Sequence, residues 1–211
     1  MRLVILFLPG LFMACALGGC DRQNPPAPQG NGANQAASAA PAAAPAGAGS
    51  GNAAAHPQYP TGRLDRSHAG TAAPDVAFED PQGQPVRLSS FRGQPLLVNL
   101  WATWCGPCVV EMPSLDAFAG RQTGGEGARI VAISQDMEGR QKVTDFFAAR
   151  SFRNLQPYLD KDMGIMTALR LETLPTTILY DSQGREVWRI TGMAEWGDER
   201  TTRLLLEADA G

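Results

Sequence analysis

The sequence predicts an α/β domain, in which helices flank a central mixed sheet and a β-hairpin extends the N-terminal end. Two nearly continuous apolar runs, at 95–101 and 128–134, suit strands that are buried on both faces of a sheet. Helical and extended patterns alternate around them in the order β-α-β-α and then β-β-α. That order is typical of one sheet with a parallel part and an antiparallel part.

Each element has its own signal in the chain. The hairpin extension is expected at 78–88, as two short strands around a Pro/Gly turn. The remaining strands are expected at 95–101, 128–134, 176–180 and 186–190, the last two joined by the turn Asp181-Ser182-Gln183-Gly184. The helices are expected at 109–119, 139–150, 163–169 and 198–207, with Asp198 as the N-cap of the last.

The first residues, MRLVILFLPGLFMACALGGC, have the charge, apolar core and small-residue end of an export signal. The end, Leu17-Gly18-Gly19-Cys20, resembles a bacterial lipobox, so we expect 1–19 to be a lipoprotein-type signal peptide and Cys20 to carry lipid. A non-lipidated signal and an uncleaved anchor are the alternatives. Asp21 resembles the signal that retains such lipoproteins in the inner membrane.

Residues 20–73 are rich in Ala, Pro, Gly, Asn and Gln and have almost no large apolar side chains. Ordering such a segment costs conformational entropy without burying apolar surface. We therefore expect a disordered tether at 20–73 and a folded domain at 74–211.

The predicted export signal reduces the number of cysteines in the folded domain. The chain has four cysteines. Cys15 lies in the signal and Cys20 at the lipidation position, so the exported domain keeps Cys105 and Cys108. One close pair does not make a disulfide-stapled scaffold. The net charge of −3 and the lack of a basic patch give no reason to expect nucleic acid as a partner.

The motif WATWCGPCVVEMP at 101–113 carries the chemistry. A cysteine between a buried strand and a helix lies at the helix N-terminus, which stabilises a thiolate. We expect Cys105 to be the exposed attacking thiol and Cys108, one turn on, to be the shielded resolving thiol. A structural disulfide is a weaker interpretation, and zinc needs about four ligands. Cu(I), which two thiolates can hold, remains an alternative.

The domain resembles the TlpA/ResA group of membrane-anchored thioredoxin-like proteins, and TlpA most closely, over 74–208. The motif at 101–113, LPTT at 174–177 and GMAEW at 192–196 carry the resemblance. It implies a thioredoxin-like fold with a cis peptide bond before Pro175, which leaves the backbone of Leu174 free to pair with a substrate strand.

The resemblance also implies roles around the cysteines. Gly106 and Pro107 set the geometry of the pair, and Trp104 forms part of the docking surface. Glu111 lies at i+3 from Cys108, where ResA-like proteins have an active-site acid that tunes the thiols. The alternative is a solvated glutamate favoured by the helix dipole. Thioredoxin has a buried aspartate where this chain has Asn99.

These observations predict a thiol–disulfide oxidoreductase that is lipid-anchored on the periplasmic face of the inner membrane. It would reduce disulfides in exported proteins. The resemblance implies apocytochrome c or copper-site assembly proteins as clients and a DsbD/CcdA-type membrane protein as electron donor. We expect no cofactor beyond the Cys105–Cys108 disulfide, and no metal. A thioredoxin-fold Cu(I) chaperone that uses the same cysteines is the competing function, and an oxidant is a third.

Overall fold

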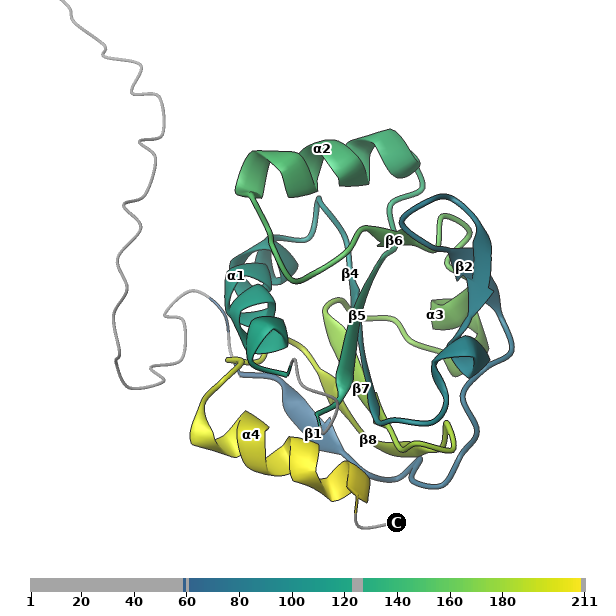
Figure 1. The fold of residues 1–211 in the computed structure, drawn as a ribbon, viewed down its shortest axis with the longest axis vertical. Helices are drawn as coiled ribbons and strands as arrows, with labels where there is room; N and C mark the ends of the chain where they lie inside the picture. The colour runs from purple at the N-terminus through teal and green to yellow at the C-terminus, as the bar shows by residue number, and fades with distance from the viewer. Residues whose placement is uncertain (1–58, 60, 123–126, 210–211) are drawn as a thin grey trace, which may run out of the picture. The chain divides into compact units, whose positions relative to one another are not determined.

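The computed structural model describes residues 59, 61–122 and 127–209, and all structural statements concern these. Their strands form one eight-stranded sheet in the order β1-β8-β7-β4-β5-β6-β2-β3 (Figure 1). The strands are β1 (Arg63–Asp65), β2 (Ala77–Glu79), β3 (Pro85–Arg87), β4 (Leu96–Trp101), β5 (Arg129–Ser134), β6 (Tyr158–Leu159), β7 (Thr176–Tyr180) and β8 (Glu186–Thr191).

The centre of the sheet is mixed, as predicted. β4 pairs parallel to β5 and antiparallel to β7. All six residues of β4 are buried, and their side chains alternate between the two faces. Leu97 and Trp101 enter one apolar cluster, whereas Val98 and Leu100 enter the other. By the same alternation, Asn99 faces the side of Leu97 and Trp101.

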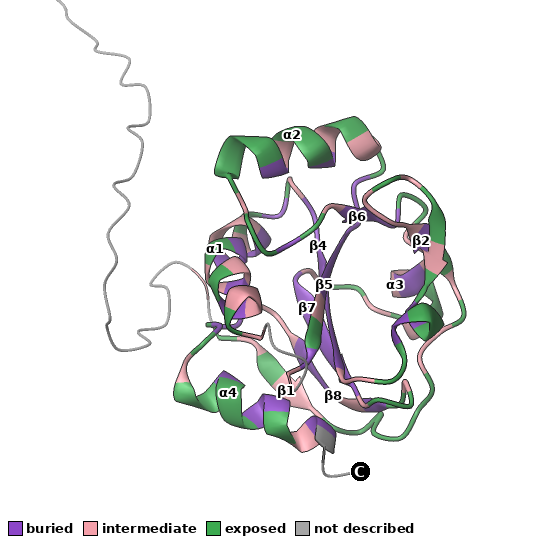
Figure 2. Ribbon diagram, in the orientation of Figure 1, coloured by how far each residue is buried: buried purple, intermediate pink, exposed green. Residues whose placement is uncertain are grey.

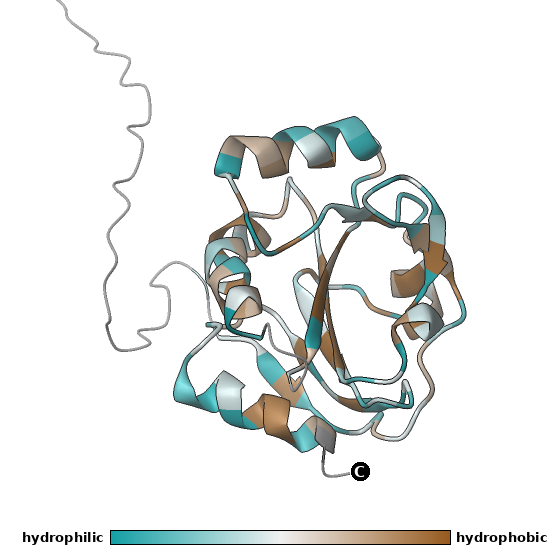
Figure 3. Cartoon of the chain, viewed as in Figure 1, coloured by the Kyte–Doolittle hydropathy of each residue, from teal (hydrophilic) through white to brown (hydrophobic). Residues whose placement is uncertain are grey.

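Helices cover both faces of this sheet. The α-helices are α1 (Gly106–Arg121), α2 (Arg140–Arg150), α3 (Gly164–Leu169) and α4 (Glu199–Leu205), and the 3-10 helices are η1 (Leu88–Phe91) and η2 (Leu206–Asp209). Residues of α1, α2 and α4 pack in the first cluster, and residues of α3 and η1 in the second. Figure 2 shows the buried strands between the helices, and Figure 3 shows the apolar residues of the central strands beside α2, in which polar and apolar residues are mixed.

The predicted start of the domain at residue 74 is wrong. β1 lies within the predicted tether and pairs antiparallel with β8, Arg63 opposite Thr191. Just before it, the Gly62 N–H donates to the Met193 carbonyl at 2.6 Å. A three-residue strand with two charged side chains has no apolar periodicity, which is why the sequence pattern missed it. β6 was also missed, because a strand of two residues is too short to show an apolar pattern.

The other elements agree with their predictions. β2 and β3 form the N-terminal hairpin, which joins the sheet where Glu79 pairs with Leu159 of β6. The Asp198 carboxylate accepts a hydrogen bond from the Thr201 N–H at 2.6 Å and so caps α4. The helix predicted at 109–119 begins earlier than its apolar spacing indicated, at Gly106, so that Cys108 lies within it.

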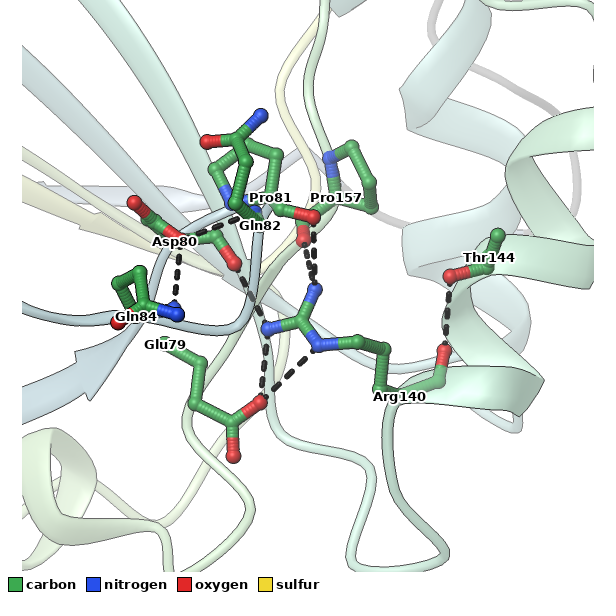
Figure 4. A network of polar contacts seen from close by, with 8 residues as sticks. All are labelled: Glu79, Asp80, Pro81, Gln82, Gln84, Arg140, Thr144 and Pro157. Carbon is green, nitrogen blue, oxygen red and sulfur yellow. Dashed lines mark hydrogen bonds and ion pairs between the residues drawn. The ribbon is translucent and has the colours of Figure 1, made fainter.

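Arg140 is not the solvated charge that a surface helix would suggest. Its guanidinium donates to the Glu79 carboxylate at 2.7 and 3.1 Å and to the Asp80 carbonyl at 2.7 Å (Figure 4). Longer bonds reach the carbonyls of Pro81 and Pro157. One side chain of α2 therefore fastens the hairpin to the body of the domain.

The predicted signal peptide, the proposed lipidation site Cys20 and most of the predicted tether lie outside the described residues. Within the part that is described, no helix has the length and apolar character needed to cross a membrane.

Candidate active site

The two predicted redox cysteines lie at the junction of β4 and α1, where they form a disulfide. Cys105 is the N-cap of α1, and its Sγ accepts a hydrogen bond from the Cys108 N–H at 3.3 Å. Helix N-terminal amides stabilise negative charge on a group at this position. In the disulfide form Cys105 is 6% exposed and Cys108 1%, so Cys105 is less open than expected.

Glu111 lies on the buried face of α1, one turn after Cys108, and is 3% exposed. Its Oε1 accepts hydrogen bonds from the Trp196 indole N–H at 2.6 Å and from the Asn99 amide at 3.0 Å. Its Oε2 accepts one from the Ala194 N–H at 3.2 Å. The alternative of a solvated first-turn glutamate is therefore wrong.

Burial and hydrogen bonding act on this acid in opposite directions. Loss of hydration raises the pKa of Glu111, whereas the hydrogen bonds from Trp196, Ala194 and Asn99 lower it, and the charge of Glu195 adds a small increase. The effect of burial is the larger one, and the pKa of Glu111 rises from 4.5 to about 8. A carboxyl group with such a pKa exchanges its proton near neutral pH, which suits general acid–base catalysis.

Asn99 connects the acid to the sheet. Besides its bond to Glu111, its amide donates to the Thr177 hydroxyl at 2.9 Å. Asn99 therefore links the acid of α1 to β7, and its amide, unlike a carboxyl group, does not titrate.

Sequence reasoning missed three of these partners. Trp196 and Ala194 belong to the 192–196 segment, which was noted only for its resemblance, and Thr177 was noted only as part of LPTT. The Trp196 ring also packs on Phe118 of α1, with centroids 5.7 Å apart. No periodicity signals that a loop after the last strand reaches the first helix.

A groove of about 520 Å³ opens beside the disulfide. The groove is lined by Cys105 and by the predicted docking residues Trp104, Pro107 and Leu174. Trp104 is 64% exposed. The N-cap of α3, the helix itself and the loop after it complete the lining with Met163, Met166, Leu171 and Glu172. The Leu174–Pro175 peptide bond is cis, and Pro175 is buried next to the groove-lining Leu174.

Gly106 has a neighbour that the sequence did not indicate. A Cβ atom added to Gly106 would lie 2.6 Å from the hydroxyl oxygen of Tyr59, a residue of the predicted tether. The φ angle of Gly106 is not positive, so the backbone does not itself require glycine here. The described end of the N-terminal segment thus contacts the redox turn.

The described residues include no group of three or more His, Cys, Asp or Glu side chains that could hold a metal ion. The thiolates of reduced Cys105 and Cys108 are soft ligands of the kind that bind Cu(I).

A cysteine pair at a helix N-terminus, a buried acid one turn further and a cis-proline loop beside a groove define a thiol–disulfide oxidoreductase with a thioredoxin-like fold. Comparison with known proteins gives the particular family. The Redoxin family model matches residues 68–205, and the chain belongs to this family.

Individual relatives agree with this assignment. The chain is 32% identical over 124 residues to the thiol-disulfide oxidoreductase ResA of Bacillus subtilis, covering 58% of this chain and 67% of the relative. It is 33% identical to ResA of Geobacillus kaustophilus, covering 58% and 69%. Among solved structures, the thio-disulfide isomerase of Thermus thermophilus matches with a TM-score of 0.55 at 26% identity, covering 66% of this chain and 96% of that one.

Proposed function

We propose that this protein is a membrane-tethered, periplasmic reductase that donates electrons to disulfides in exported proteins. The observation that carries the proposal is the position of Glu111, buried one helical turn from Cys108 with a pKa near 8. Such a group can take the proton of the resolving thiol at the pH of an exported compartment and return it to solvent later.

The reaction begins with the reduced protein. The Cys105 thiolate attacks one sulfur of a client disulfide, the client S–S bond breaks, and the second client sulfur leaves as a thiolate that takes up a proton. Cys108 then loses its proton to Glu111 and attacks the Cys105 sulfur of the mixed disulfide. The first client sulfur leaves and is protonated. The client has gained two electrons and two protons, and Cys105 and Cys108 are joined again.

The groove supports a protein as the client. It is mainly apolar, is next to Cys105 and includes Leu174, whose backbone precedes β7 and could pair with an extended client segment. The flexible thioethers of Met163 and Met166 can adapt to different client side chains. Exported apocytochrome c or copper-site assembly proteins are the client classes that the family resemblance favours.

The anchor and the electron source belong to the same proposal. The lipobox-like sequence that ends at Cys20 supports lipid attachment on the periplasmic face of the inner membrane. Each turnover leaves the protein as its disulfide, so two electrons must be supplied. A dithiol membrane protein of the DsbD/CcdA type, whose own thiols become a disulfide, balances the cycle.

A trapping experiment identifies the client, and the reduction potential tests the direction of electron flow. Cys108→Ser removes the resolving thiol, so a client under reduction should stay bound to Cys105 as a mixed disulfide that mass spectrometry identifies. The matched control, Cys105→Ser, should trap no clients. The reduction potential of the purified protein should lie near −270 mV, the value of thioredoxin. A potential near −120 mV, the value of DsbA, would contradict the reductase proposal.

The copper alternative is tested on the same reduced protein. Stoichiometric, tight Cu(I) binding together with negligible disulfide turnover would favour a chaperone. Turnover with a protein disulfide that persists when Cu(I) is chelated would favour the reductase.

A further inference from the structure

A second buried carboxylate lies beyond the end of β5, outside the chemistry described above. Asp136 is 1% exposed. Its Oδ2 accepts hydrogen bonds from the Thr103 N–H at 2.9 Å and the Ser134 hydroxyl at 2.6 Å. Its Oδ1 accepts one from the Thr103 hydroxyl at 2.6 Å. Two of the three bonds thus go to one residue of the motif that precedes Cys105.

Breaking the hydrogen bonds between Asp136 and Thr103 would be energetically costly. A carboxylate buried without hydrogen bonds is strongly unfavourable, so its donors are held in place by the cost of losing them. Thr103, half-buried at the surface, is therefore fixed from both its backbone and its side chain.

The loop between β4 and α1 is tied to the residues after β5 at Thr103, and bonds on either side of Thr103 continue the order of the chain. The Gln135 N–H donates to the Trp101 carbonyl at 2.8 Å, which continues the pairing of the two strands. The Asp136–Thr103 contact follows, and the Cys105 N–H then donates to the Ala102 carbonyl at 3.1 Å. The last of these bonds leads directly into the N-cap geometry of Cys105.

We propose that Asp136 is a positioning residue for the redox reaction: through Thr103 it holds the 102–104 loop so that the Cys105 sulfur stays against the N-terminus of α1. Asp136 acts on the loop and needs no contact with the client. The inference requires only thiol–disulfide exchange at Cys105, in either direction, so it goes beyond the proposed reductase function and does not depend on it.

The test compares Asp136→Asn, Thr103→Val and Thr103→Ser in the full chain. The measured quantity is the rate at which the reduced protein reacts with bis(2-hydroxyethyl) disulfide, as a function of pH. For Asp136→Asn and Thr103→Val we expect the rate to fall about tenfold or more, because small displacements of a reacting group are costly. The midpoint of the pH–rate profile should move to higher pH, since the sulfur loses the helix N-terminus. Thr103→Ser keeps the hydroxyl and should stay near wild type.

Combining the two changes tests the route of the effect. If Asp136 acts through Thr103, the double variant Asp136→Asn with Thr103→Val should be no slower than the slower single variant. Effects that multiply would contradict the proposal.

Asp160→Asn is the matched control. Asp160 is also buried, and its carboxylate accepts hydrogen bonds from the Gly164 and Ile165 N–H groups at the start of α3. This control should lower thermal stability and leave the pH–rate profile in place. The proposal is wrong if Asp136→Asn does the same. If Asp136→Asn does not fold, the comparison of Thr103→Val with Thr103→Ser serves as the test. An unchanged pH–rate profile in Thr103→Val then overturns the proposal.

Discussion

Glu111 accepts hydrogen bonds from three neutral groups and is 3% exposed, and this arrangement decides at which pH it is charged. Its pKa of about 8 in the folded protein lies above the ordinary value of 4.5 that it has in an unfolded chain. Between these two pH values the folded protein holds a proton that the unfolded chain has released. The proton contributes stability that is fully present below pH 4.5 and is lost as the pH rises through 8.

At the residue scale, we therefore predict that the oxidised protein loses stability as the pH is raised from about 5 to 9. The shift corresponds to a loss on the order of 4 kcal/mol. The free energy of unfolding, measured by urea denaturation at a series of pH values, checks this. Glu111→Gln cannot titrate, so its stability should vary much less over the same range.

The same variant tests the acid role. In the reduced protein, Glu111→Gln should shift the titration of the thiols and slow turnover without unfolding the domain, because Cys108 loses its proton acceptor. Trp196→Phe is a useful companion, since loss of the indole donor should raise the pKa of Glu111 further. A pH profile that neither change alters would show that Glu111 is structural.

At the element scale, Arg140 of α2 adds to the strand pairing and apolar contacts that hold the hairpin of β2 and β3. The guanidinium of Arg140 makes its bonds in a planar fork, which a lysine ammonium cannot reproduce. We predict that Arg140→Lys costs about 1 to 3 kcal/mol of stability. Hydrogen exchange should accelerate in residues 77–87, while the reactivity of the cysteines stays the same.

Lys142→Ala is the control for this prediction. Lys142 lies on the same helix and pairs with Glu138 in an i,i+4 salt bridge that is largely exposed. Its loss should cost less than about 0.5 kcal/mol. Equal effects of the two substitutions would mean that the Arg140 network does not hold the hairpin.

The elements that could be predicted from the sequence are those with a strong local signal. β4 and β5 are continuous apolar runs, and the turn after β7 carries an Asp at its start and Gly184 at a positive φ angle. β1 could not be predicted, because it forms by pairing with β8 and buries little apolar surface of its own. An edge strand of three residues depends on its partner, which lies more than a hundred residues away in the chain.

At the scale of the whole molecule, the proposed anchor and the folded domain can be tested separately. We predict that Cys20→Ala abolishes incorporation of a labelled fatty acid and releases the protein from the membrane fraction. Cys15→Ala, in the predicted signal peptide, should leave both unchanged. Membrane attachment of Cys20→Ala without label would point to an uncleaved apolar anchor instead.

The sequence by itself determined the fold class, the cysteine pair and the chemistry of that pair, because strand patterning and the Cys-Gly-Pro-Cys spacing are local. It also placed Glu111 on the same helical face as Cys108. Only the tertiary structure decided that this glutamate is buried and that its pKa is raised. Asn99 from β4 and Trp196 from the loop after β8 meet it in the interior, and the removal of water there raises its pKa. Contacts of this kind join segments far apart in the chain, and no spacing within one segment encodes them.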